Sequence, residues 1–327
     1  MIKKCMLFML LLLLLFTPGV SALKVVSTTA VLWDPAQYIG GEKVQAIYIA
    51  DPTICPHMQA DIIPNRIQME KDFIRAADLY IAHNGSVDVS YVMPYVTDFM
   101  AANSLGTVEW VTLKNPSMTW NTPEGAKLLS TEVAGWLIEA DPANRSYYES
   151  RLNEYLAEID AADLSADEKK RIGGQDVVVM IWQQDAAEKW LGLHTVSVFA
   201  PEFYKNGQFT PRAVVNDIYN NSTRYAGVKY VIENMQSGEM AKGLEEALRD
   251  QKIDAKRVIF TNFPKSLPGV DSLPDVLRYN KQLVMPSAQG QASPEATTAA
   301  PTKAPLSLLL LPLALGAAFV LIGRRDP

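Results

Sequence analysis

The sequence predicts an α/β protein with two lobes, each built on a four-stranded, mostly parallel sheet flanked by helices, and one long rigid helix joining the lobes. Short runs rich in β-branched residues alternate with helical stretches, and this alternation occurs twice along the chain. Such a pattern is typical of parallel strands joined by crossover helices. Roughly 260 residues remain once both apolar ends are set aside, enough for two lobes with cores of their own.

The expected elements follow in chain order. The strands of the first lobe are predicted at 25–27, 44–49, 79–82 and 108–112, and those of the second at 177–181, 195–199, 229–232 and 258–261. Residues 122–140 have helical apolar spacing, and Asp141-Pro142 then begins a second helix that runs to about 160, because proline favours a first helical position. We therefore expect an N-terminal lobe at 23–140, a bridging helix at 141–163 and a C-terminal lobe at 164–285. An ordinary surface crossover helix is the alternative for 141–163.

The amino end has the order of a secretory signal peptide. Two lysines precede an apolar run, and Val20-Ser21-Ala22 supplies small residues for cleavage after Ala22. Residues 1–22 are thus expected to be removed. Cys5 lies inside the apolar run, so it is not placed to become a lipid-modified first residue.

The carboxyl end predicts a membrane anchor. Residues 286–304 are almost wholly small or polar and predict a disordered tether, whereas 305–323 are long and apolar enough for one transmembrane helix. Arg324 and Arg325 follow at once, which places the tail 324–327 on the cytoplasmic side and the lobes outside the cell. The arrangement resembles the carboxyl-terminal anchors of archaeal surface proteins. A buried helix of the globular part is the alternative.

Composition excludes some partners. The formal net charge is −6 and the chain has no basic run, which argues against nucleic acid binding. Cys55 is the only cysteine after signal removal, so no intramolecular disulfide can form. We expect a monomer. Glycosylation triplets, which also arise by chance, begin at Asn84, Asn144, Asn220 and Asn221.

The loop that carries His57 is a candidate ligand-binding element. Residues 50–57 predict the end of a strand followed by a loop that presents His57. Residues 77–85 predict the end of a helix, then a strand, then a turn at Asn84-Gly85. Open α/β sheets bind ligands at the carboxyl ends of their strands. His83 and His194 lie at a turn and at a strand start, so we interpret both as structural.

The chain resembles the metal-binding substrate-binding proteins of zinc- and manganese-type ABC importers. The resemblance spans about residues 24–285 and lies in ten short motifs in the family's order: Lys24-Val-Val-Ser-Thr-Thr29, Ile39-Gly-Gly-Glu-Lys-Val44, Asp51 to His57, Ala77-Asp78-Leu79, Asn84-Gly85, Asn115-Pro116, Asp141-Pro142-Ala143-Asn144, Gln184-Asp185-Ala186, Gly192-Leu193 and Asp271 to Asn280. It implies a divalent metal, zinc or manganese, held between two lobes and delivered to an ABC permease in the membrane.

The resemblance also implies three histidines and one carboxylate as ligands, of which only His57 is present. The other positions fall at Ser117, at Gln184 or its neighbour Gln183, and at or near Asn262. Hydroxyl and neutral amide oxygens are poor zinc donors. We therefore expect weak zinc binding.

Two features could compensate for the missing ligands. Cys55 stands two residues from His57, on the same face of an extended segment, and Met58, Met118 and Met180 are expected nearby, which makes a softer ion such as Cu(I) conceivable. Alternatively, Cys55 and these methionines are core residues. Trp33, Trp120 and Trp182 are expected beside the cleft, where aromatic walls would suit an organic ligand or a metal chelate; they too could be core residues.

Three classes of function remain. The first is a membrane-tethered receptor that captures a metal ion or metal complex for an ABC permease, without catalysis. The second is a cell-surface adhesion or scaffold protein with a degenerate metal site. The third, an enzyme using Cys55 and His57 as a thiol hydrolase, lacks an evident orienting carboxylate or oxyanion hole. We therefore predict a protein that is not an enzyme.

Overall fold

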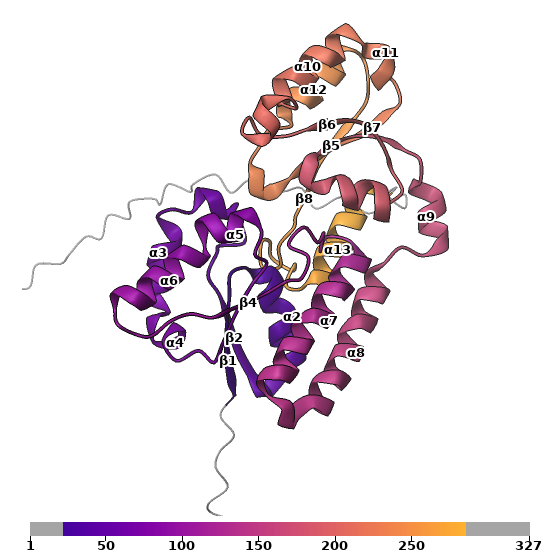
Figure 1. Cartoon of the computed structure of the whole chain (residues 1–327). Helices are drawn as coiled ribbons and strands as arrows, with labels where there is room; N and C mark the ends of the chain where they lie inside the picture. Colours follow the sequence, from indigo (N-terminus) through magenta and orange to yellow (C-terminus); the bar gives the residue numbers. More distant parts are fainter. Residues whose placement is uncertain (1–21, 286–327) are drawn as a thin grey trace, which may run out of the picture. The chain divides into compact units, whose positions relative to one another are not determined.

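The computed structural model describes residues 22–285 and contains two four-stranded parallel sheets (Figure 1). The strand orders are β2-β1-β3-β4 and β6-β5-β7-β8, so both sheets share one topology. All eight strands lie where the sequence predicts them, which confirms the α/β fold class.

The first sheet and its helices form the N-terminal lobe. Its elements are β1 (Leu23–Ser27), α2 (Ala30–Gly40), β2 (Val44–Tyr48), α3 (Ile62–Met69), α4 (Lys71–Ile74), β3 (Leu79–Ala82), α5 (Ser86–Tyr91), α6 (Met93–Ala102), β4 (Trp110–Thr112) and α7 (Pro123–Ala140). Thr122 caps α7, since its side chain accepts a hydrogen bond from Gly125 N and proline follows at the first helical position.

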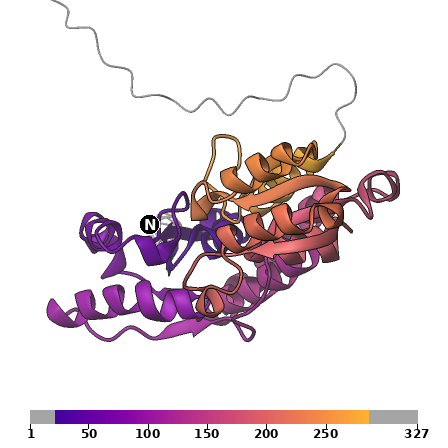
Figure 2. The ribbon, with the colours of Figure 1, turned by 90° about the horizontal axis from the view of Figure 1, so that it is seen from above.

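The second sheet and its helices form the C-terminal lobe. Its elements are α9 (Ala166–Ile172), β5 (Asp176–Met180), β6 (His194–Phe199), α10 (Pro211–Asn220), α11 (Ser222–Tyr225), β7 (Val228–Asn234), α12 (Lys242–Asp250), β8 (Lys256–Phe260) and α13 (Leu273–Val284). Figure 2 shows from above that the orange and yellow elements of this lobe, α13 included, lie together.

Alternating side chains let each sheet face two cores. Val177 and Val179 of β5 belong to a core that also contains residues of α2, α7, α8 and α13, whereas Val178 and Met180 belong to a separate core beneath α10 and α12. This division follows from the two-residue period of a strand. The first of these cores contains residues of both lobes, so the lobes share buried apolar surface.

Helix α8 (Arg145–Ala162) joins the lobes, preceded by a 3₁₀ turn at Pro142–Asn144. The α-helix therefore begins slightly later than the sequence predicts. Asp141, just before the turn, accepts hydrogen bonds from the side chains of Asn144 and Tyr148. Arg151 and Tyr155 of α8 bond to Tyr38 and Asp34 of α2, respectively. The helix is thus attached along its length.

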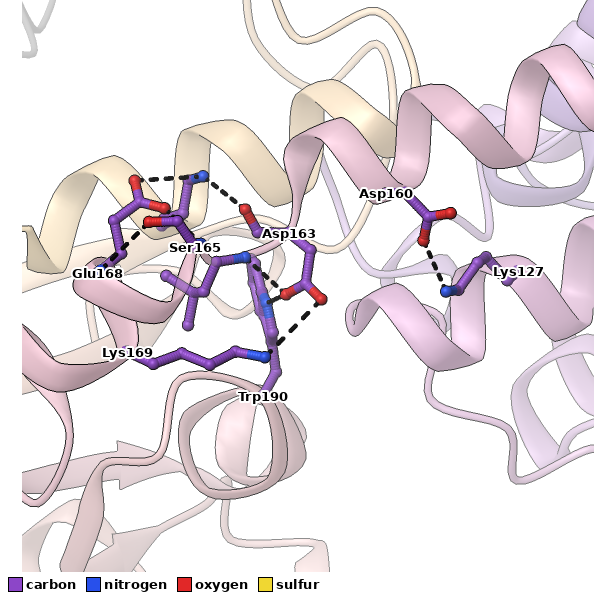
Figure 3. A network of polar contacts seen from close by, with 9 residues as sticks. Lys127, Asp160, Asp163, Ser165, Glu168, Lys169 and Trp190 are labelled. Carbon is purple, nitrogen blue, oxygen red and sulfur yellow. Dashed lines mark hydrogen bonds and ion pairs between the residues drawn. The ribbon is translucent and has the colours of Figure 1, made fainter.

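Polar contacts also fix the point where α8 enters the second lobe (Figure 3). Asp163 accepts hydrogen bonds from the indole of Trp190 at 2.8 Å and from Leu164 N at 2.6 Å. Ser165 and Glu168 form a capping box at the start of α9. These contacts support the prediction of a stiff connection rather than a loose hinge.

The sheet topology defines where ligands should bind. In each sheet the first strand connects to a neighbour on one side, and the next connection returns to the other side, so the strand order reverses between β1 and β3 and between β5 and β7. Such topological switch points form crevices at the carboxyl ends of the strands. The loops that follow the strands therefore carry the candidate site.

The predicted signal peptide, tether and transmembrane helix lie almost wholly outside the described residues. Between residues 22 and 285, no helix is long and apolar enough to cross a membrane.

Candidate metal-binding site between the lobes

The loop that carries His57 is built around one buried amide. After β2 the chain forms a 3₁₀ turn at Pro56–Met58, followed by Gln59, which is fully buried. The Gln59 side chain donates hydrogen bonds to Asp51 O at 2.8 Å and Ile54 O at 2.7 Å, and it accepts one from Asp51 N at 2.7 Å. Gln59 thus fixes the conformation of the loop from within.

The same loop is attached to the opposite lobe through Gln236, which follows β7. Cys55 N donates to Gln236 O at 3.2 Å, and the Gln236 side chain donates to Pro52 O at 3.0 Å. Gln236 Nε2 also donates to Thr261 Oγ1 at 2.9 Å. One buried amide therefore connects the His57 loop to the loop that follows β8.

His57 lies between aromatic rings of both lobes. Its ring centroid is 6.2 Å from that of Tyr91 in α5 and 5.1 Å from that of Phe203 in the C-terminal lobe. His57 Nδ1 lies 2.8 Å from Cys55 Sγ, within hydrogen-bonding distance. Burial lowers the pKa of His57 and raises the pKa of the Cys55 thiol, so desolvation favours the neutral form of both groups.

Four side-chain amides meet where the two lobes contact each other, and we call them the amide cluster: Asn121, Gln183, Asn234 and Asn262. Asn121 Nδ2 donates to Gln183 Oε1 and to Asn262 Oδ1, both at 3.0 Å. Gln183 Nε2 donates to Asn262 Oδ1 at 2.8 Å and to Asn234 Oδ1 at 2.9 Å. Asn121 comes from the N-terminal lobe, so the cluster joins the two lobes by direct hydrogen bonds.

The amide cluster occupies positions where the resemblance implies metal ligands, at Gln183 and Asn262. The oxygens of these two residues accept hydrogen bonds from neighbouring amides, and neither residue carries a charge to offset a dication. In the described part of the chain, no group of three or more His, Cys, Asp or Glu side chains could hold a metal ion. The full ligand set of the resemblance is therefore absent there.

Gln184 and Ser117 bond to residues outside the amide cluster. Gln184 donates to Glu188 at 3.0 Å and lines a cavity of about 410 Å³ beside β6. Ser117 is exposed, and its backbone N–H bonds to Asn115. Of the alternatives Gln183 and Gln184, the structure brings only Gln183 into the cluster.

Of the tryptophans expected beside the cleft, two contact residues of the amide cluster. Trp120 donates from its indole to Asn262 O at 2.8 Å, and the carbonyl of Trp182 accepts from Asn121 at 3.1 Å. Trp33 instead donates to Ala46 O and packs edge-on against Tyr48. Its indole therefore supports β2 rather than the amide cluster.

The methionines expected nearby have different environments. Met180 is fully buried in the core beneath α10 and α12, and Met118 packs against the shared core. Met58, by contrast, is 61% exposed beside His57. Of these three methionines, Met58 is the exposed one.

The remaining histidines have structural partners. His83 is buried, its Nε2 lies 2.7 Å from Thr29 Oγ1, and Trp120 covers its ring at a centroid distance of 4.6 Å. His194 is exposed, and its Nδ1 lies 2.7 Å from Asp176 Oδ1. These contacts agree with the structural roles expected for both.

Sequence reasoning missed several cleft residues, namely Asn121, Asn234, Gln236, Tyr91 and Phe203. A signal existed for Asn234 and Gln236, because an amide-rich segment follows the apolar strand 228–232 and strand ends carry ligand-binding groups. Phe203 and Tyr91 give no such signal, because an aromatic residue in a sequence does not by itself show whether it lies at a binding site.

Comparisons with known proteins agree with this architecture. The family model described as "ZnuA: Zinc-uptake complex component A periplasmic" matches residues 25–283. The chain is 27% identical over 172 residues to the manganese ABC transporter substrate-binding lipoprotein PsaA of Streptococcus anginosus, covering 45% of this chain and 51% of that relative. The match thus spans about half the length of this curated relative.

Solved structures show the same fold at low sequence identity. A crystal structure of ZnuA matches with a TM-score of 0.57 and 16% identity, covering 80% of this chain and 97% of that one. The cadmium-bound periplasmic metal-binding protein from Candidatus Liberibacter asiaticus matches with a TM-score of 0.61 and 15% identity, covering 81% and 98%. With the family model matching along both lobes, the chain belongs to the ZnuA family of periplasmic zinc-uptake components.

Proposed function

We propose that this protein is an extracytoplasmic substrate-binding protein that captures a metal ion or metal complex and delivers it to an ABC permease. The position of His57 carries the proposal. The imidazole lies between Tyr91 of one lobe and Phe203 of the other, on a loop that both lobes hold by hydrogen bonds. A ligand bound there would contact both lobes and stabilise their closed arrangement.

The cargo site we propose is centred on His57 and Cys55, with the amide cluster as its floor. Zinc or manganese is the cargo class that the family suggests, and the neutral floor predicts weaker binding of either dication than a carboxylate-containing site would give. Capture and release need no catalytic group, and we propose none.

We further propose that the chain is exported by residues 1–22 and tethered to the outer face of the membrane by 305–323. The apolar run followed by Arg324 and Arg325 supports this orientation. A tether of nineteen residues, 286–304, would leave the lobes near a permease in the same membrane.

A scaffold function is the second candidate, because the amide cluster joins the lobes by direct hydrogen bonds. Thermal unfolding of the full-length chain in detergent separates the two. If the protein is a receptor, zinc or manganese at 100 times Kd should add about 2.7 kcal/mol to the free energy of unfolding, and His57→Ala should remove the effect.

His194→Ala is the matched control, since His194 is exposed and lies at the start of β6. It should keep the metal-dependent stabilisation. Absence of stabilisation by any metal ion or chelate would favour the scaffold, and nanomolar zinc binding retained after His57→Ala would exclude the proposed site.

A further inference from the structure

The turn at Pro56–Met58 brings soft donor atoms together. His57 Nδ1 lies 2.8 Å from Cys55 Sγ, and Met58 N donates to Cys55 O at 2.9 Å, which closes the turn. In a 3₁₀ turn, side chains three positions apart eclipse each other. The hydrogen bond across the turn therefore brings the backbone of Met58 next to that of Cys55.

Hydrogen bonds hold the backbone of the loop that carries these donors. Gln59 fixes the loop through Asp51 and Ile54, and Gln236 holds Cys55 N from the opposite lobe. Ligands oriented by neighbouring hydrogen bonds lose little freedom on binding. The backbone of this turn is therefore preorganised for binding.

The charge available at this turn suits a monovalent ion. Cys55 contributes one negative charge when its proton leaves, and within residues 22–285 no third His, Cys, Asp or Glu side chain completes a metal-binding group there. A dication would keep an uncompensated positive charge in half-buried surroundings. Thiolate and thioether ligands favour Cu(I) and zinc over manganese or magnesium, and the single negative charge then favours Cu(I) over the dication zinc.

Apolar side chains from both lobes surround the turn. Phe203 approaches His57 from the C-terminal lobe, and the Trp182 ring lies 6.2 Å from that of Phe203. Phe203 and Met58 are 64% and 61% exposed. In the proposed complex these two side chains would cover part of the ion.

We propose that Cys55, His57 and Met58 form a binding site for Cu(I), with a thiolate, an imidazole nitrogen and a thioether as ligands. The role of this ion as cargo rests on the proposed function. Binding replaces the proton between Sγ and Nδ1 with the ion and separates these atoms by roughly 1 Å more, given ordinary metal–ligand bond lengths. The Cys55 thiol releases one proton to solvent, and copper keeps its oxidation state.

The test uses the full-length chain in detergent, reduced and without oxygen, and Cu(I) held by a coloured bicinchoninate complex. The wild-type protein should withdraw one Cu(I) per chain and release one proton. Cys55→Ala and His57→Ala should each weaken Cu(I) binding by at least a factor of about 100, and Met58→Leu by about 10.

Met69→Leu is the matched control for Met58, because Met69 is an 80% exposed methionine in α3. It should leave Cu(I) affinity unchanged. The proposal is overturned if Cys55→Ala keeps wild-type affinity, or if Met58→Leu and Met69→Leu behave alike.

A parallel titration with zinc and manganese separates this proposal from the proposed function. Binding of either dication that depends on His57, together with no withdrawal of Cu(I), would overturn the copper site and leave the receptor function intact. Binding of no metal at all would overturn both.

Discussion

The Gln183 side chain donates a 2.8 Å hydrogen bond to Asn262 Oδ1, although the two residues lie 79 positions apart in the sequence. Asn262 also accepts from Asn121, which belongs to the opposite lobe. Where the family resemblance implies a metal between an imidazole and a carboxylate, this chain has amides bonded to each other.

Restoring a carboxylate at position 262 should strengthen the binding of dications. Asn262→Asp keeps an acceptor for Asn121 and Gln183 and adds a negative charge to the amide cluster. After allowance for desolvation, we expect zinc or manganese affinity to rise by about tenfold, measured by calorimetric titration. Asn153→Asp, on the exposed side of α8, adds the same charge elsewhere and should have no effect. Equal gains in both variants would contradict a local role for Asn262.

A methyl group at Gly125 should disturb the cleft through the backbone. A Cβ there would lie 2.0 Å from Thr119 O, so the loop that carries Trp120 and Asn121 would have to move. We expect Gly125→Ala to lower the free energy of unfolding by about 2 kcal/mol and to weaken metal binding.

Gly135→Ala provides the comparison within the same helix, because a Cβ at Gly135 meets no atom within 4 Å. This variant should be more stable by about 0.5 kcal/mol. Urea unfolding measures both variants, and a Gly125→Ala protein as stable as Gly135→Ala would show that the loop adapts freely.

Stability should depend on pH through Asp34 of α2. Burial raises the pKa of Asp34 from 3.8 to about 7, although hydrogen bonds from Tyr155 OH and Leu273 N act against the shift. The folded state therefore binds a proton that the unfolded chain releases. As the pH falls from above 7 to about 4, the free energy of unfolding should rise by up to ~4 kcal/mol relative to Asp34→Asn.

The measurement is denaturant unfolding of the wild type and Asp34→Asn at several pH values, since other titrating groups cancel in the difference. Tyr155→Phe removes a hydrogen bond that lowers the pKa of Asp34, so it should move the transition to higher pH. A difference that does not change between pH 4 and 8 would refute the assignment.

Removing only one partner of the ion pair between Glu233 and Arg257 should lower the free energy of unfolding. Glu233 is 1% exposed, its side chain accepts a hydrogen bond from Ala241 N, and Arg257 Nη1 lies 2.9 Å away. Arg257→Met should lower the free energy of unfolding by about 3 kcal/mol, because a buried carboxylate loses its partner.

The double variant Glu233→Gln/Arg257→Met tests this reason for the loss. Glutamine keeps an acceptor for Ala241 N without a charge, so the double variant should regain most of the stability in urea unfolding. No recovery would mean that Arg257 acts mainly by packing.

The sequence by itself determined the sheets and the location of the loop that carries His57. Alternating apolar residues such as Val177 and Val178 enter opposite cores, and this period of two is a local property of strands. It also predicted that Cys55 and His57 lie close together. The structure agrees, although a 3₁₀ turn rather than an extended segment brings their side chains into contact.

Only the tertiary structure decided which amides meet. Gln183 enters the cluster and Gln184 points toward Glu188, because the 3₁₀ turn after β5 sends adjacent side chains in different directions. Asn121 is brought to Gln183 and Asn262 by packing of the opposite lobe. Contacts between residues 62 to 141 positions apart depend on how two sheets are placed against each other, and no local pattern encodes that placement.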